Sequence, residues 1–360
     1  MPLHQSATYV WESLDKPPAH DYTRVSNPTR ACLEKVIASL EGGGHCLSTN
    51  SGMSAIYAAF SFLKSGDCLM AAKDIYGGTQ RIIDKILPGY NIDVVEFDPR
   101  DLDSFDAAVP SNAKMLVFET PSNPNLRVAD IARIAEVSKR HGLISVIDNT
   151  FASPALQNPL LLGVDISVHS TTKYICGHSD VIGGAVCTLS DDLYGPMYEW
   201  GKSVGTAPSP FDCWLQLRGV KTLAVRMKQH CENALAVAEF LKGHPSIDEV
   251  FYPGLESDPG HQIAKKQMSG FGGMVSCTVK GGFEGTAKVA EGCEIFLLAE
   301  SLGAVESLIG YPARMSHAAM PEEERVRRGI PNNMLRLSIG IEDADDLIAD
   351  LKQALARVRI

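Results

Sequence analysis

The chain has 360 residues, 45% hydrophobic and 21% charged, which is ordinary for a globular protein of two domains or of one large domain with a smaller companion. A net charge of −10 without a long basic run argues against nucleic acid and anionic membranes as partners. Nine cysteines without CxxC or zinc-type spacing, and no segment that fits a membrane span or a signal peptide, lead us to expect a cytoplasmic protein without a bound metal.

Two regions precede residue 226. Residues 1–30 carry Pro17, Pro18 and Pro28 and show no core-forming pattern, so we expect an extended arm there. Residues 31–225 alternate short apolar runs with helical patterns. The predicted strands are 68–72, 92–97, 114–120, 143–149 and 164–170, and the predicted helices are 51–64, 77–87 and 128–142. This alternation predicts an α/β domain, with helices on both faces of a mostly parallel sheet.

The pattern changes beyond about Lys221. A long helical stretch at 223–245 precedes predicted strands at 250–253 and 273–282, a helix at 285–301, a strand at 333–342 and a helix at 343–358. We therefore expect a smaller α+β domain over residues 226–360, joined to the first by the long helix.

Polar side chains stand at the ends of three predicted strands. Ligands of an open parallel sheet bind at the carboxyl ends of its strands, so these residues are candidates for one site, although each alone could be a cap or turn residue. They are Glu119, Thr120, Ser122 and Asn123 after one strand, Asp148 and Asn149 after the next, and Ser170, Thr172 and Lys173 after the third.

Lys173 together with Asp148 indicates a particular chemistry. A lysine at a strand end either extends its amine to solvent or keeps it in a partly dry pocket, where it loses basicity and can condense with an aldehyde. Pyridoxal 5′-phosphate needs such an amine, and a carboxylate beside its pyridine nitrogen. The start of the helix at Gly52 and Met53 offers backbone N–H groups for the phosphate, although a plain helix cap gives the same pattern.

The stretch "DISVHSTTKYICGHS", which contains Lys173, resembles the lysine signature of the Cys/Met-metabolism pyridoxal-phosphate enzymes position for position. The similarity runs from "HDYTRVSNPTR" to "NMLRLSIGIEDADDLIADL" and includes "ETPSNP", "VIDNTFASPALQNPL" and "LAESLGAVESL". The resemblance implies the fold-type I (aspartate-aminotransferase-like) architecture. It also implies a homotetramer, built as a dimer of dimers, whose active sites are shared between subunits.

The resemblance further implies roles for individual residues. Lys173 would bind the cofactor's aldehyde and act as the base, Asp148 would pair with the pyridine nitrogen, and Tyr76 would stack on the ring and serve as a second base. The other implied cofactor contacts are Asn123 at the phenolic oxygen, Gly52, Met53, Ser170 and Thr172 at the phosphate, and Tyr22 and Arg24 at a neighbouring subunit's phosphate. Without the resemblance, Tyr22 and Arg24 would be assigned to a solvated arm.

Five residues are implied in substrate binding. Arg336 would clamp the α-carboxylate with help from Ser301, although a surface salt bridge is the common fate of a strand arginine. Glu300, Arg81 and Asp21 would contact the distal end of the substrate. The acidic residue at position 300 resembles the one that the γ-synthase and γ-lyase branches of the family carry there. We expect a trans-sulfuration enzyme that makes cystathionine from O-succinylhomoserine and L-cysteine, with cystathionine γ-lyase as the alternative.

Two departures and two rival interpretations remain. The arm is shorter than the family usually carries, and Ser26 stands where a glycine is common, which bears on the tetramer and on the local turn. A nicotinamide dehydrogenase would share the parallel sheet but should show a glycine fingerprint, which is absent. A non-catalytic binding module on the same scaffold would lose Lys173 or Asp148, and both are present.

Overall fold

A seven-stranded sheet forms the centre of the larger part of the computed structural model, which describes residues 2–318 and 320–358. Its strands are β1 (His45–Thr49), β2 (Cys68–Ala72), β3 (Asp93–Phe97), β4 (Ala113–Glu119), β5 (Ile144–Asp148), β6 (Ile166–His169) and β7 (Gly184–Thr188). The spatial order is β1-β7-β6-β5-β4-β2-β3, and the pairs from β3 to β6 are all parallel. Only β7 runs antiparallel, to both β6 and β1. The predicted mostly parallel sheet is confirmed.

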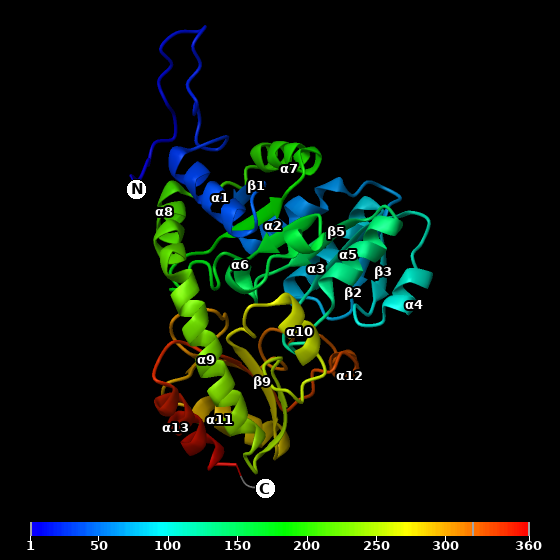
Figure 1. Ribbon diagram of the computed structural model, residues 1–360, viewed down its shortest axis with the longest axis vertical. Coiled ribbons are helices and arrows are strands. Elements are labelled where there is room, and N and C mark those ends of the chain that lie inside the picture. Colours follow the sequence, from blue (N-terminus) through cyan, green and yellow to red (C-terminus); the bar gives the residue numbers. More distant parts are fainter. Residues whose placement is uncertain (1, 319, 359–360) are drawn as a thin grey trace.

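Helices cover both faces of this sheet (Figure 1). They are α1 (Pro28–Leu40), α2 (Gly52–Ala59), α3 (Gly77–Lys85), α4 (Leu102–Ala107), α5 (Ile131–Arg140), α6 (Ser153–Leu156), α7 (Asp191–Val204) and α8 (Pro210–Gly219). Alternate residues of β2 face opposite ways: Leu69 packs in the cluster with Ile82 of α3, and Met70 in the cluster with Ile134 of α5. A strand buried on both faces explains the continuous apolar runs in the sequence.

A five-stranded sheet organises the smaller part. Its elements are β8 (Ile247–Phe251), α10 (His261–Gln267), β9 (Met274–Val279), α11 (Gly282–Gly292), β10 (Leu297–Leu298), β11 (Leu308–Gly310), α12 (Glu322–Arg327), β12 (Met334–Ser338) and α13 (Ala344–Leu355). The strand order is β10-β11-β12-β9-β8. The long helix α9 (Leu223–Lys242) leads into this part along the molecule (Figure 1), and the predicted boundary at 225/226 falls inside it.

The helix expected at 285–301 is wrong beyond Gly292, where α11 ends. The carboxylate of Asp350, on α13, accepts hydrogen bonds from the backbone N–H groups of Glu294, Ile295 and Phe296 at 2.7–3.0 Å. This side chain satisfies donors that a continued helix would have bonded internally, so the chain can turn into β10.

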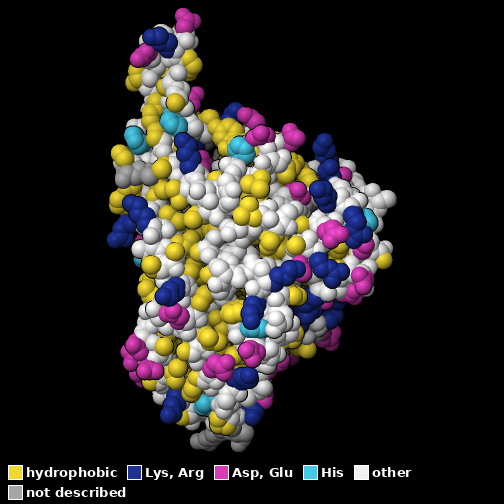
Figure 2. Space-filling view, viewed as in Figure 1, with side chains coloured by type: hydrophobic (Ala, Val, Ile, Leu, Met, Phe, Trp, Pro, Cys, Tyr) yellow, Lys and Arg dark blue, Asp and Glu magenta, His cyan; other side chains and the backbone are white. Residues whose placement is uncertain are grey.

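Residues 2–27 form an arm that projects from the body (Figure 1), joined to itself by an antiparallel bridge between Thr8 and Tyr22. Val10 and Leu14 are each 92% exposed, and Figure 2 shows hydrophobic side chains along this arm. The arm was expected to extend to residue 30. It ends at residue 27, because α1 begins at Pro28 with the Asn27 side chain as its N-terminal cap. Among the described helices, none is long and apolar enough to cross a membrane.

Candidate active site

A cavity of about 780 Å³ opens at the carboxyl ends of β4, β5 and β6 and is closed on its other side by the smaller part of the chain. Eleven of the residues with a predicted role line it: Gly52, Met53, Tyr76, Asn123, Asp148, Ser170, Thr172, Lys173, Glu300, Ser301 and Arg336. These residues lie up to 284 positions apart in the numbering, so the fold brings together what the sequence keeps separate.

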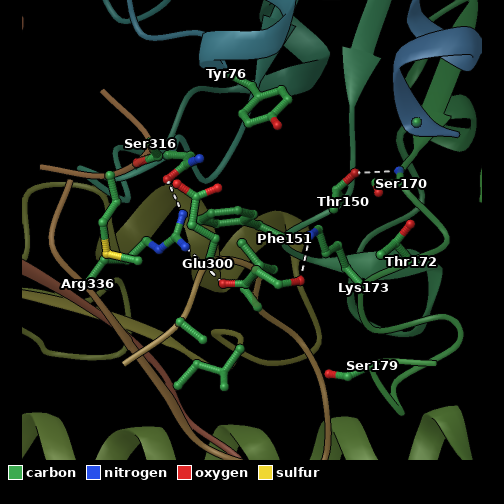
Figure 3. A pocket seen from close by; sticks show the side chains of 18 of the residues that line it. Tyr76, Thr150, Phe151, Ser170, Thr172, Lys173, Ser179, Glu300, Ser316 and Arg336 are labelled. Carbon is green, nitrogen blue, oxygen red and sulfur yellow. Dashed lines mark hydrogen bonds between the residues drawn. The ribbon is translucent and has the colours of Figure 1, made fainter. Parts of the chain in front are cut away.

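Lys173 follows β6 by four residues and extends into the cavity (Figure 3). Its Nζ donates a hydrogen bond to Ser301 Oγ at 2.7 Å. Burial and the positive charge of Arg336 lower the pKa of the amine to about 8, and the carboxylate of Glu300 opposes that shift. A substantial fraction of the amine is therefore neutral, and nucleophilic, near physiological pH.

Two carboxyl groups stand opposite each other in the sheet register, Glu119 at the end of β4 and Asp148 at the end of β5. Burial raises the pKa of Asp148, while hydrogen bonding from Thr150, whose N–H lies 3.0 Å from Oδ1, opposes the shift. Burial and the charge of Asp148 raise the pKa of Glu119 well above its ordinary value. Two such groups on adjacent strands favour a cationic guest.

Glu119, one of the strand-end candidates but without an assigned role, orients two other site residues. It accepts hydrogen bonds from the backbone N–H groups of Tyr76 at 2.8 Å and Asn123 at 2.6 Å. Its place at a strand end was the available signal. Thr150 was not among the predicted candidates: its hydroxyl accepts a hydrogen bond from the N–H of Ser170 at 2.8 Å (Figure 3) and so ties β5 to the segment before Lys173.

The N-terminus of α2 presses against Ser170. A Cβ on Gly52 would lie 2.8 Å from the Ser170 Cβ, so only glycine permits this approach. Ser51 caps the N–H of Ser54, whereas the N–H groups of Gly52 and Met53 have no acceptor within the helix. These donors sit in the cavity wall beside the Ser170 hydroxyl, an arrangement suited to a phosphate.

Thr172 occupies the same wall with its hydroxyl already engaged. Its Oγ1 exchanges hydrogen bonds with the backbone of Gly183 at 3.0 and 3.3 Å. The Thr172 hydroxyl therefore uses its proton and one lone pair in hydrogen bonds to the backbone of Gly183. Thr172 thus stabilises the turn before Lys173 and also lines the cavity.

Arg336, on β12, enters the cavity from the side opposite the large sheet and is 7% exposed. Its guanidinium donates to Asn123 Oδ1 at 3.0 Å and to the carbonyl of Ser301 at 2.9 Å (Figure 3). It forms no salt bridge with any described residue. A buried guanidinium of this kind is poised to bind an incoming carboxylate.

Tyr76 closes another side of the cavity, and its ring is directed into it (Figure 3). Burial and the charge of Asp148 raise the pKa of its hydroxyl, and Arg81 acts in the opposite direction. A Cβ on Gly78 would lie 2.4 Å from the Tyr76 ring, so the glycine leaves the ring the space it occupies.

Four residues with a predicted role lie outside this cavity, as do the strand-end candidates Thr120, Ser122 and Asn149. Arg81 is exposed on α3. Asp21, Tyr22 and Arg24 are exposed on the arm, where the Arg24 guanidinium lies 5.5 Å from the centre of the Tyr22 ring and donates to the carbonyl of Lys202 at 2.7 Å. Within one chain, therefore, the arm residues contribute nothing to the cavity.

The cavity is also lined by residues for which no role was predicted. Tyr311, Pro312, Met315 and Ser316 come from the segment between β11 and α12, in whose described residues there is neither helix nor strand. No group of three or more His, Cys, Asp or Glu among the described residues is arranged to hold a metal ion.

These features fit pyridoxal 5′-phosphate at three points. Lys173 offers an amine with a lowered pKa to the aldehyde, and Asp148 offers a carboxylate to a protonated pyridine ring. The glycine-dependent approach of α2 to Ser170 offers N–H donors to the phosphate.

Comparisons with known proteins agree with this geometry. The profile of the family described as "Cys/Met metabolism PLP-dependent enzyme" matches residues 1–356. A cystathionine β-lyase of Lactococcus lactis subsp. cremoris is 46% identical over 99% of this chain and 94% of its own length. A cystathionine γ-synthase of Mycobacterium leprae is 46% identical over 99% and 91%. The crystal structure of a Lactobacillus plantarum cystathionine γ-lyase with L-serine matches with a TM-score of 0.96 at 42% identity, covering 99% and 93%.

Proposed function

The chain belongs to the family of Cys/Met metabolism PLP-dependent enzymes, and we propose that within this family it is a cystathionine γ-synthase. In this reaction the γ-substituent of an O-acylhomoserine, O-succinylhomoserine in our proposal, is replaced by the thiol of L-cysteine to give cystathionine. The observation that carries the proposal is the joint presence of Lys173, Arg336 and Glu300 in one cavity.

Each of these three residues suits one part of cystathionine. Arg336 offers a planar pair of donors to the α-carboxylate. Lys173 offers a partly neutral amine beside that carboxylate, so it can act at the adjacent Cα. Glu300 offers a negative charge to the second ammonium group, which the L-cysteine half carries.

Bound pyridoxal 5′-phosphate supplies an aldehyde for the substrate amine and an electron-withdrawing ring. The protein residues supply binding and proton transfer. Arg336 holds the carboxylate and so fixes Cα near Lys173 Nζ. The neutral Nζ takes the Cα proton, moves a second proton at Cβ, and returns protons later in the cycle. Asp148 keeps negative charge beside the ring nitrogen, and Ser301 Oγ holds Nζ in place between transfers.

Cystathionine γ-lyase is the second candidate, favoured by the position of Arg81. We expected Arg81 to bind the distal carboxylate of O-succinylhomoserine, but this side chain is exposed on α3 and does not line the cavity of its own chain. The distal end of cystathionine carries an ammonium group beside its carboxylate, so Glu300 in the cavity offers it a contact that the distal carboxylate of O-succinylhomoserine lacks. One similar solved structure is a cystathionine γ-lyase.

Product analysis separates the candidates. The purified holoenzyme is incubated with O-succinylhomoserine and L-cysteine, and separately with cystathionine alone. A γ-synthase forms cystathionine in the first mixture, whereas a γ-lyase forms cysteine, 2-oxobutanoate and ammonia in the second. Formation of homocysteine, pyruvate and ammonia would instead identify a β-lyase, the activity named for the Lactococcus relative. That result would overturn the proposal.

We also propose that the arm completes the site of a neighbouring subunit in a homotetramer. The arm has exposed apolar side chains and no core of its own, which suits a segment that packs on another copy. Tyr22, Arg24 and Asp21 would then reach the phosphate and the substrate of the partner's cavity, which explains their absence from their own.

A further inference from the structure

Three buried polar residues form a stripe along α9: Arg226, His230 and Asn233. Their spacing of four and three residues places them on one face of the helix. Their exposures are 3%, 0% and 1%, although long polar side chains rarely enter a protein interior without a partner. All three hydrogen-bond to backbone carbonyl groups of segments outside α9.

Arg226 binds the turn that follows the active-site lysine. Its Nη1 donates to the carbonyl of Tyr174 at 2.7 Å, and Nη2 donates to the carbonyls of Ile175 at 3.3 Å and Gly219 at 3.0 Å. Tyr174 and Ile175 are the two residues directly after Lys173. Arg226 forms no salt bridge with any described residue, so neutral hydrogen-bond acceptors, mainly backbone carbonyl groups, stabilise this buried cation.

Two further contacts fix the guanidinium in this position. Its Nε donates to Thr222 Oγ1, one helical turn earlier, at 3.0 Å. A Cβ on Gly177 would lie 2.0 Å from Arg226 Nη1, and Gly177 has a φ of +73°. The turn therefore closes on the guanidinium only because Gly177 lacks a side chain.

The other end of the stripe binds the segment after β12, the strand that carries Arg336. His230 Nδ1 donates to the carbonyl of Ile339 at 2.7 Å, and burial lowers the pKa of the imidazole to about 4, so the ring is neutral. Asn233 Nδ2 donates to the carbonyls of Gly340 at 3.1 Å and Glu342 at 2.7 Å. The His230 ring also packs edge-on against Tyr174, with centroids 5.1 Å apart.

We propose that this stripe is the positioning element that sets the distance between Lys173 and Arg336. From residue 226 to residue 233 an α-helix rises by about 10 Å, a rigid spacer between the segment that presents the amine and the one that presents the carboxylate clamp. Arg226 is the main positioning residue. The inference rests on the proposed function in one respect, that Lys173 and Arg336 act on the same substrate, and holds for synthase and lyase alike.

The test replaces the several N–H donors of the Arg226 guanidinium by a single ammonium group and keeps the positive charge. In Arg226→Lys, a single ammonium cannot reach the three carbonyls, so we expect kcat to fall by about 10- to 100-fold, as for a misplacement near 1 Å, while KM stays within about threefold. A second readout needs no activity. In the apoprotein, the N–H groups of Cys176 and Gly177, bonded to Thr171 and Lys173 carbonyls, should exchange with deuterium at least about tenfold faster.

Val237→Ala is the matched control, because Val237 is fully buried on the same helix and its truncation destabilises the protein without touching the lysine turn. It should leave kcat and exchange at 176–177 at the wild-type values. If Arg226→Lys does not fold, Thr222→Val tests the same point, since it removes the Nε acceptor and should change both readouts in the same direction by less.

Wild-type kcat and exchange in Arg226→Lys, or the same losses in Val237→Ala, would overturn the proposal. A wild-type enzyme that turns over none of the substrates above would defeat the proposed function instead. Faster deuterium exchange at Cys176 and Gly177 in Arg226→Lys would then still support the conclusion that Arg226 stabilises the turn after Lys173.

Discussion

Ser301 contacts both of the cationic residues in the cavity. Its hydroxyl oxygen lies 2.7 Å from Lys173 Nζ, and its carbonyl accepts a hydrogen bond from Arg336 at 2.9 Å. Ser301 has a φ of +105°, a backbone conformation that residues other than glycine rarely adopt. A strained residue at this point joins the amine that we propose moves protons to the guanidinium that we propose binds the substrate carboxylate.

Two substitutions at position 301 separate the hydroxyl from the backbone. Ser301→Ala keeps the carbonyl but removes the contact with Lys173, and we expect kcat/KM to fall about tenfold, the value of one hydrogen bond to a charged group. Ser301→Gly should lose the same activity but be at least as stable as Ser301→Ala in urea unfolding, because glycine tolerates this φ. Wild-type kcat/KM in both variants would remove the hydroxyl from the mechanism.

Lys173→Ala should abolish turnover and leave no covalently held cofactor. The reason is that no other amine of the cavity wall can replace Lys173, since the remaining cationic group there belongs to Arg336. The measurement is borohydride treatment followed by mass spectrometry of the peptide that contains residue 173. Wild-type protein should be yellow, bleach, and retain the cofactor mass. Substantial residual activity in the variant would exclude the assigned role.

Asp148→Asn should lower kcat by at least about 100-fold, because a neutral amide cannot keep the ring nitrogen protonated. The side chain keeps its size, and Asn can still accept the hydrogen bond that Thr150 now donates to Oδ1. Folding should therefore be preserved, which circular dichroism would check. The absorption spectrum of the bound cofactor should change with the rate, and a near-wild-type rate would count against the pyridine contact.

Local sequence pattern alone made the strand-end residues of the large sheet candidates for the site. Asp148 and Lys173 end consecutive apolar runs, and the rule that parallel strands end at one sheet edge brings them together. The contact of Lys173 with Ser301 spans 128 residues, and no periodicity connects them. Resemblance to a family supplied Ser301 and Arg336. The helix predicted to extend past Gly292 failed for a similar reason, since the competing acceptor, Asp350, lies on a different element.

Lys173 should make the stability of the apoprotein depend on pH. Its pKa is about 8 in the folded chain and 10.5 as the ordinary value, so between these pH values the unfolded chain holds a proton that the folded chain lacks. The contribution of this group to the free energy of unfolding therefore rises as pH increases through that window. Lys173→Met removes the contribution, so wild-type minus variant stability, from urea unfolding, should rise between pH 8 and 10.5.

Glu300→Gln provides the control for that titration. The Glu300 carboxylate raises the pKa of Lys173, against the lowering by burial and by Arg336, so its neutralisation should lower the pKa further. The window in which stability rises should then begin at a lower pH. A flat difference between wild type and Lys173→Met would show that the amine is not held in a dry environment.

Mixed oligomers test whether the arm completes a neighbouring site. Arg24→Ala and Lys173→Ala should each be inactive or nearly so, the first because Arg24 is expected at the partner's phosphate. When the two variants are unfolded, mixed and refolded together, a hybrid dimer has one site with both defects and one site with neither. Random mixing in equal amounts should thus restore about a quarter of wild-type activity. If Arg24 served its own chain, every site would carry a defect and no activity would return. The exposed position of Arg24, which contacts the Lys202 carbonyl and the Tyr22 ring, leads us to expect the first outcome.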